Sequence, residues 1–102
     1  MAVVPITKDN FTALVLESDK PVLLDFYATW CGPCRMVSPL VDEIAEEHPE
    51  FTVGKIDVDA EGELAQQFGI VSIPTIVAMK DGEIVRQNVG YAPKDELLSM
   101  MD

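Results

Sequence analysis

The two cysteines of the chain stand three residues apart in the segment Trp30-Cys31-Gly32-Pro33-Cys34. Thiols at this spacing can close a small disulfide ring and open it again, a change that carries two electrons and two protons. The segment follows an apolar run and precedes a helical pattern. The N-terminus of a helix lowers the pKa of a nearby thiol, and the thiolate is the reactive form. The spacing and the position therefore predict a redox-active dithiol.

The two thiols are expected to play different parts in the reaction. Pro33 suits the first turn of a helix and fixes where that helix begins. Cys31 then precedes the turn, and we expect it to be the exposed nucleophile. Cys34 lies inside the turn, behind Cys31, and we expect it to be the resolving thiol. Gly32 and Pro33 support this geometry between the cysteines.

Three other interpretations of the cysteine pair are possible. A structural disulfide that closes so small a ring removes little entropy from the unfolded chain. A structural zinc site needs about four ligands, and beyond the two cysteines this chain offers only the distant His48, so zinc would have to be shared between subunits. Cysteines that are merely buried would not need Gly-Pro between them. We therefore favour the redox interpretation and expect no metal.

Length, composition and charge exclude several classes of protein. A chain of 102 residues, 48% of them hydrophobic, suits one compact domain spanning 1–102. The net charge of -11, with only 7 Lys and Arg, argues against nucleic acid as a partner. No segment is long and apolar enough to span a membrane. Residues 1–5 lack the pattern of a signal peptide, so we expect a cytoplasmic protein, although a secreted chain that had lost its signal peptide would look the same.

The hydrophobic pattern around the cysteines predicts a central strand followed by a helix. Val22–Ala28 is nearly continuously apolar, as in a strand covered on both faces. After the cysteines, apolar residues recur at the spacing of one helical face up to about Glu47. Pro39 lies inside this helix and removes one of its hydrogen bonds.

The rest of the chain predicts further alternation of strands and helices. A first helix is expected after Thr7 or Asp9, either of which could cap it, with Phe11, Leu14 and Val15 on one face. Asp81-Gly82 predicts a tight hairpin. Other strands are expected at 3–6, 51–57, 75–79 and 83–89, and other helices at 61–68 and after Pro93. This order predicts an α/β fold with helices on both faces of a largely parallel sheet, to which the hairpin adds an antiparallel edge.

The cysteine motif resembles the active site of the thioredoxin family, and the resemblance covers nearly the whole chain. The segments that carry it are the strand and loop Val22–Trp30, the helix proline Pro39, the loop Ile73-Pro74-Thr75, the hairpin Lys80-Asp81-Gly82 and the glycine of Val89-Gly90. The resemblance implies a thioredoxin fold, with a central five-stranded mixed sheet flanked by four helices. Tyr27 departs from the family, where a second tryptophan is common, and so does Ala92, where a serine or threonine cap is common.

The resemblance also implies an activity and its partners. The family reduces disulfides of protein substrates by forming a reversible Cys31–Cys34 disulfide, and an NADPH-dependent thioredoxin reductase reduces it again. No bound cofactor is expected, and we expect a monomer that acts as an electron carrier. A thiol oxidase or isomerase is an alternative, disfavoured because oxidising relatives commonly place histidine where this chain has Gly32-Pro33. A binding subunit without turnover is a second alternative, disfavoured by the intact dithiol.

Asp25 is the most informative charged residue because it interrupts an apolar strand. Burial raises the pKa of a carboxyl group and is costly without a partner. The resemblance implies that Asp25 is the acid/base group that serves Cys34, and that Lys55 of the next strand lies close to it. The alternatives are a carboxylate satisfied at a strand end and an ordinary exposed lysine.

The resemblance implies a substrate-binding surface around the cysteines. Pro74 is expected to follow a cis peptide bond and to place the backbone of Ile73 where it can pair with an extended substrate. Gly90 would allow close approach of the substrate backbone. Trp30 is expected to be exposed at the rim of this surface.

Overall fold

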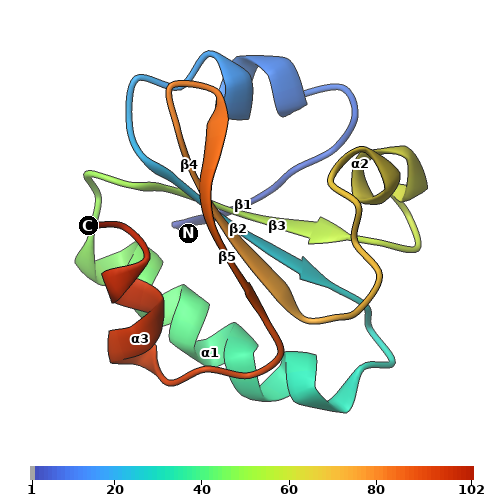
Figure 1. The fold of residues 1–102 in the computed structure, drawn as a ribbon. Helices are drawn as coiled ribbons and strands as arrows, with labels where there is room; N and C mark the ends of the chain where they lie inside the picture. Colours follow the sequence, from blue (N-terminus) through green and yellow to red (C-terminus); the bar gives the residue numbers. More distant parts are fainter. Residues whose placement is uncertain (1) are drawn as a thin grey trace.

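The computed structural model describes residues 2–102, whose five strands form one mixed sheet (Figure 1). The strands lie side by side in the order β1-β3-β2-β4-β5. β1 and β2 are parallel to β3, whereas β4 is antiparallel to both β2 and β5. Their bounds are Val3–Pro5, Val22–Tyr27, Thr52–Asp57, Thr75–Lys80 and Glu83–Val89 for β1 to β5. The expected sheet is confirmed.

Four helical segments cover the two faces of the sheet. They are η1 (Thr12–Leu16), α1 (Gly32–Glu47), α2 (Gly62–Gln67) and α3 (Lys94–Ser99). In Figure 1, α1 and α3 lie on one side of the sheet, while α2 and the blue helical turn η1 lie on the other. Each layer has its own core: Leu23 and Ile76 pack with α1 and α3, and Leu24 and Phe26 pack with η1 and α2. None of the helices in residues 2–102 is long and apolar enough to cross a bilayer.

The first helical segment differs from its prediction. η1 is a π-helix, closed by a bond from the Glu17 N–H to the Thr12 carbonyl. The turn that leads into η1 is held by Asn10, whose Oδ1 accepts a hydrogen bond from the Thr7 N–H at 2.8 Å. Neither Thr7 nor Asp9 caps the helix with its side chain. Leu14, expected on the apolar face, is exposed, whereas Phe11 and Val15 are buried.

β2 and α1 together set the position of the cysteines. Leu23 and Leu24 of β2 point to opposite faces and are both fully buried, which explains the unbroken apolar run. β2 ends at Tyr27, and α1 begins at Gly32 after a short loop. The buried stripe of α1 then holds the helix against the sheet, with Cys34 at its start and Val37, Val41, Ile44 and Ala45 along it.

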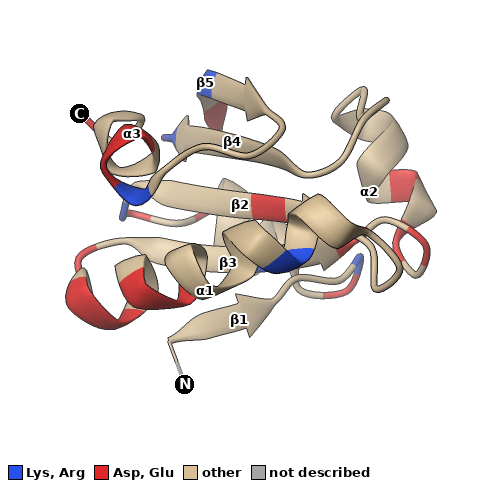
Figure 2. Cartoon of the chain, turned by 90° about the horizontal axis from the view of Figure 1, so that it is seen from below, with Lys and Arg blue, Asp and Glu red and all other residues tan. Residues whose placement is uncertain are grey.

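The C-terminal helix α3 packs against α1 through the buried Leu97 and also makes ion pairs with it. Lys94 of α3 forms ion pairs with Glu43 at 2.9 Å and Glu47 at 2.8 Å. Figure 2 shows acidic residues gathered at this end of α1 and again around the start of α2, with few basic residues between them. α3 has Pro93 as its N-cap and no side-chain cap, and Ala92 is buried in the core.

Gly54 of β3 provides a test of the packing beneath η1. A Cβ atom added there would lie 2.5 Å from Cγ1 of the buried Ile6 and 3.3 Å from Cδ2 of Leu24. Gly54→Ala should therefore lower the free energy of unfolding by about 1–3 kcal/mol, measured by urea denaturation. Gly62→Ala in α2 is the matched control, because nothing lies within 4 Å of its added Cβ. Equal stabilities for the two variants would contradict this account of the packing.

Candidate active site

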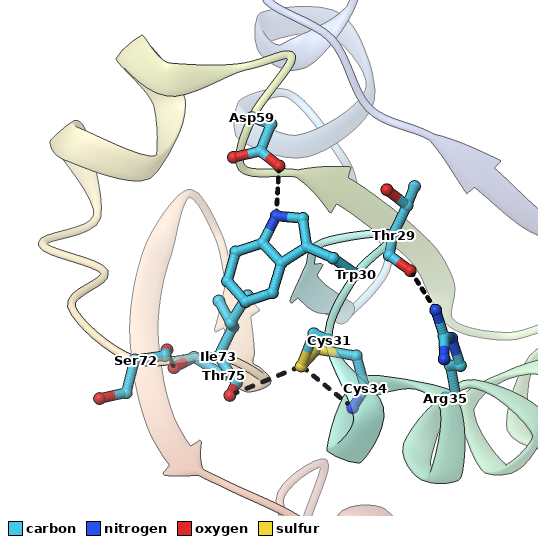
Figure 3. The surroundings of a disulfide bond; sticks show 9 residues. All are labelled: Thr29, Trp30, Cys31, Cys34, Arg35, Asp59, Ser72, Ile73 and Thr75. Atoms are coloured by element: carbon cyan, nitrogen blue, oxygen red, sulfur yellow. Dashed lines mark hydrogen bonds between the residues drawn. A yellow bond between two sulfur atoms is a disulfide. The ribbon is translucent and has the colours of Figure 1, made fainter.

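The dithiol lies at the N-terminus of α1. Cys31 is the N-cap residue, and Cys34 is in the first turn of the helix. The two form a disulfide, with their Cα atoms 5.3 Å apart (Figure 3). The Cys34 N–H donates to Sγ of Cys31 at 3.2 Å, so the sulfur takes the place of a capping oxygen. This bond directs the partial positive charge of the helix end onto Cys31.

Both cysteines are buried in the disulfide form. Cys31 is 4% exposed and Cys34 is 3% exposed, so the prediction that Cys31 is exposed is wrong for this form. The sulfur of Cys31 is turned toward the helix N–H groups and lies 3.9 Å from the carbonyl oxygen of Ile73. Ile73 and Ala28 pack around it. The loop that carries Ile73 therefore covers the ring.

The Ile73-Pro74 loop faces the disulfide as expected. The peptide bond between these residues is cis. Thr75 Oγ1 donates to the Ser72 carbonyl at 2.6 Å on one side of the bond, and the Gly90 N–H donates to the Pro74 carbonyl at 2.8 Å on the other. Gly90 has φ 92°, a conformation that favours glycine. These bonds fix the loop that carries Ile73 and hold Gly90 next to Pro74.

Trp30 lies at the rim of the site, as predicted, and is 66% exposed. Its indole Nε1–H donates to Oδ2 of Asp59 at 2.8 Å. Figure 3 shows the opposite edge of the ring turned toward Ile73. The hydrogen bond thus fixes a large exposed side chain next to the nucleophile position.

Asp25 is buried, and one of its carboxyl oxygens has no hydrogen-bond partner among residues 2–102. The residue is 3% exposed, and no residue of the described chain hydrogen-bonds its Oδ1. Burial, followed by repulsion from Asp42, raises the pKa of Asp25 to about 7, against about 3.9 for a free aspartate, and attraction from Lys55 opposes this rise. Lys55 stands opposite Asp25 in the register of β2 and β3, and its Nζ lies 5.9 Å from the ring centroid of Tyr27.

A cavity of about 260 Å³ joins Asp25 to Cys34. Arg35 lies at its edge and donates through Nη2 to the Thr29 carbonyl at 2.9 Å. A space of this size holds several waters, and its polar lining can bind them. The residues that line it are Asp25, Tyr27, Ala28, Thr29, Cys34, Arg35, Ser38 and Lys55. Asp25 and Cys34 therefore line one cavity, which opens to solvent beside the exposed residues Thr29, Arg35 and Ser38.

His48, the one histidine of the chain, has no part in this site. It lies at the other end of α1, where Nδ1 is 2.8 Å from Oε2 of Glu50 and the ring stacks on Phe51. Across residues 2–102, no three His, Cys, Asp or Glu side chains gather in a way that could hold a metal ion.

Comparison with known proteins identifies the family. The family profile described as "Thioredoxin" matches residues 2–102. The chain belongs to the thioredoxin family. It is 48% identical over 97 residues to "Thioredoxin" of Alicyclobacillus acidocaldarius subsp. acidocaldarius, covering 94% of this chain and 91% of that protein. It is 50% identical over 98 residues to "Thioredoxin" of Mycobacterium bovis, covering 95% and 84%. It is also 49% identical over 96 residues to "Bifunctional thioredoxin reductase/thioredoxin" of Mycobacterium leprae, covering 93% of this chain and 21% of that one.

Membership of the thioredoxin family identifies the activity of this site. The protein is a disulfide oxidoreductase that works through the Cys31–Cys34 pair. The chemistry this requires is a sulfur that can be attacked and a second sulfur within bonding reach, and the first turn of α1 supplies both.

Sequence reasoning missed three residues of this thioredoxin site. Asp59 follows β3, and Trp30 follows β2. Because the C-terminal ends of these parallel strands meet at one edge of the sheet, the position of Asp59 near Trp30 could have been inferred. Arg35 and Ser38 lie on α1 one residue and four residues after Cys34. Helical spacing places a residue at i+4 on the same face as Cys34, which was the available signal for Ser38.

The raised pKa of Asp25 predicts a pH-dependent stability. Between about pH 4 and 7 the folded protein keeps a proton that the unfolded chain has lost, so the free energy of unfolding falls as pH rises through this window. A shift of about three units corresponds to on the order of 4 kcal/mol. In Asp25→Asn this dependence should vanish. The difference in unfolding free energy between variant and wild type, measured on the disulfide forms, should therefore change by that amount between pH 4 and 8.5.

Glu46→Gln is the control for this measurement, since Glu46 is exposed and forms no ion pair or side-chain hydrogen bond within the described part of the chain. Its difference from wild type should stay nearly constant. Parallel stability curves for wild type and Asp25→Asn would show that Asp25 titrates normally.

Proposed function

We propose that the protein reduces the disulfides of other proteins. The observation that supports this most directly is the Cys31–Cys34 disulfide at the start of α1, covered by the Ile73 loop and flanked by the exposed Trp30. In the proposed cycle this disulfide is the end product of a turnover. The dithiol is the active donor of two electrons.

The cycle starts with the thiolate of Cys31, which attacks one sulfur of a substrate disulfide and displaces the other as a thiolate. A mixed disulfide joins Cys31 to the substrate. Cys34, as a thiolate, then attacks the sulfur of Cys31 and releases the second substrate sulfur. The substrate gains two electrons and takes up two protons as its thiolates protonate, and the protein is left with the Cys31–Cys34 disulfide. Gly32 and Pro33 keep the two sulfurs within one helical turn.

Asp25 is proposed to take the proton from Cys34 during the second step. Its pKa of about 7 suits a group that must accept and return a proton near neutral pH. Water in the cavity between Asp25 and Cys34 would carry the proton. Lys55 stabilises the carboxylate once the proton has left, because its charge lowers the pKa of Asp25. Lys55 therefore acts as a supporting residue.

Substrates are proposed to bind across Trp30, Ile73, Pro74 and Gly90. An extended peptide can pair with the backbone of Ile73, as in the addition of a strand to a sheet. The Gly90 N–H is already bound to the Pro74 carbonyl, so the absence of a side chain on Gly90 is what would let a substrate backbone approach.

We infer that an NADPH-dependent thioredoxin reductase restores the dithiol. The name of the Mycobacterium leprae relative joins a reductase and a thioredoxin, which supports such a partner for this chain. We further propose that the protein works in the cytoplasm as a monomeric, single-domain electron carrier over residues 1–102, without a cofactor of its own. Nucleic acid does not fit as a partner, given the net charge of -11.

The two cysteines should respond differently to substitution by serine. Cys31→Ser should reduce the rate of insulin-disulfide reduction to the uncatalysed background, because the attacking sulfur is gone. Cys34→Ser should stop at the mixed disulfide, because nothing resolves it, and should accumulate covalent adducts with substrate on non-reducing gels.

The double variant Cys31→Ser/Cys34→Ser is the control and should form no adduct. Normal turnover by Cys34→Ser would contradict the two-thiol mechanism, and adducts formed through Cys34 in Cys31→Ser would reverse the two roles.

A further inference from the structure

One charged group stands on the substrate side of the dithiol in a fixed position. Asp59 accepts the Trp30 indole N–H through Oδ2 at 2.8 Å, and its own N–H donates to Oδ1 of Asp57 at 2.9 Å. One bond thus fixes the Asp59 carboxylate at the rim of the site, and the other fixes the backbone that carries it. Most exposed carboxylates lose conformational entropy when they meet a partner, and Asp59 has less of it to lose.

No cation of the protein neutralises Asp59 within residues 2–102. Lys8, which lies against the same acidic segment, pairs with Glu63 at 3.0 Å and donates its backbone N–H to Glu61. Arg35 is bound to the Thr29 carbonyl and is separated from Asp59 in Figure 3 by the Thr29–Trp30 segment. The charge of Asp59 is therefore free to act on whatever docks beside Cys31.

The side chain that contacts Asp59 is aromatic and exposed. Trp30 is 66% exposed. The polar edge of the indole is occupied by Asp59, which leaves the ring faces as the available contact. An aromatic face beside a carboxylate attracts an ammonium or guanidinium group, through the ring quadrupole and through charge.

We propose that Asp59 and Trp30 select disulfides that have a lysine or arginine next to the attacked cysteine. The occupant of this surface is then a disulfide-bearing protein segment whose basic side chain lies over Trp30 with its charge against Asp59. This inference rests on the proposed function, since it names a class of substrate for the same site. The net charge of -11 draws basic segments to the protein from a distance, and Asp59 places the charge beside the reacting sulfur.

The test compares two cyclic peptide disulfides that are identical except for lysine or glutamate next to one cysteine. The pre-reduced protein is mixed with each peptide, and the second-order rate constant of peptide reduction is followed by chromatography. Wild type should reduce the lysine peptide about 3–10 times faster than the glutamate peptide at low salt. About 0.5 M NaCl should largely remove this preference, because salt screens the attraction between charges at the exposed rim of an interface.

Asp59→Asn isolates the charge, since an amide oxygen can still accept the Trp30 indole N–H. An unchanged Trp30 emission maximum, from the one tryptophan of the chain, would report that this bond is kept. The lysine-to-glutamate ratio should fall at least threefold toward unity. Glu46→Gln removes one charge from the exposed side of α1 and should keep both rate constants and their ratio.

Different results would overturn the inference alone or the proposed function as well. A wild-type protein that reduces both peptides at equal rates overturns this inference and leaves the proposed function standing. A ratio that survives in Asp59→Asn, or that falls equally in Glu46→Gln, also overturns it, because the preference would then come from the overall charge. A wild-type protein that reduces neither peptide overturns the proposed function, and the inference with it.

Discussion

The hydrogen bond from the Cys34 N–H to the sulfur of Cys31 is the contact around which the site is arranged. It makes a sulfur the cap of α1, so the start of the helix and the position of the reactive atom cannot vary independently. β2 delivers the chain to this point, and the buried stripe of α1 holds the helix against the sheet. The Ile73 loop then closes over the ring from the other side. A shift of α1 along its axis would therefore disturb capping, ring closure and substrate contact together.

Asp25 is the residue at which, in the proposed mechanism, stability is given up for chemistry. A buried carboxyl group with an oxygen that lacks a hydrogen bond, as Oδ1 of Asp25 does within residues 2–102, is unfavourable in either protonation state, and most so when it is charged. The strand around it is apolar, and Leu23, Leu24 and Phe26 would fold at least as well beside a hydrophobic residue. Burial and repulsion from Asp42 raise the pKa of Asp25 to about 7, and attraction from Lys55 opposes this rise. In the proposed mechanism, the cavity shared with Cys34 gives the proton its route. The proposed acid/base role of Asp25 would account for this cost to the fold.

Local patterns in the sequence predicted the elements that hold the dithiol. The features that these patterns did not predict depend on contacts between segments far apart in the sequence. The apolar run of β2, the helical repeat of α1 and the hairpin at Asp81-Gly82 each depend on neighbouring residues, and the structure has all three. The burial of Cys31 depends on a loop more than 40 residues away, and the bond between Trp30 and Asp59 joins the ends of two strands. The π-helical geometry of η1 is not indicated by any local pattern; its neighbour Phe11 packs in the core shared with α2.

The direction of electron flow is the central claim, and the reduction potential of the Cys31–Cys34 pair tests it most directly. The protein would be equilibrated with glutathione redox buffers of known ratio, and its dithiol and disulfide forms would be counted after acid quenching and thiol alkylation. A donor of electrons to protein disulfides should have a potential more negative than the glutathione poise of the cytosol, about -220 to -260 mV. A potential near -120 mV, about that of a strong thiol oxidant, would contradict the account and assign the protein to disulfide formation.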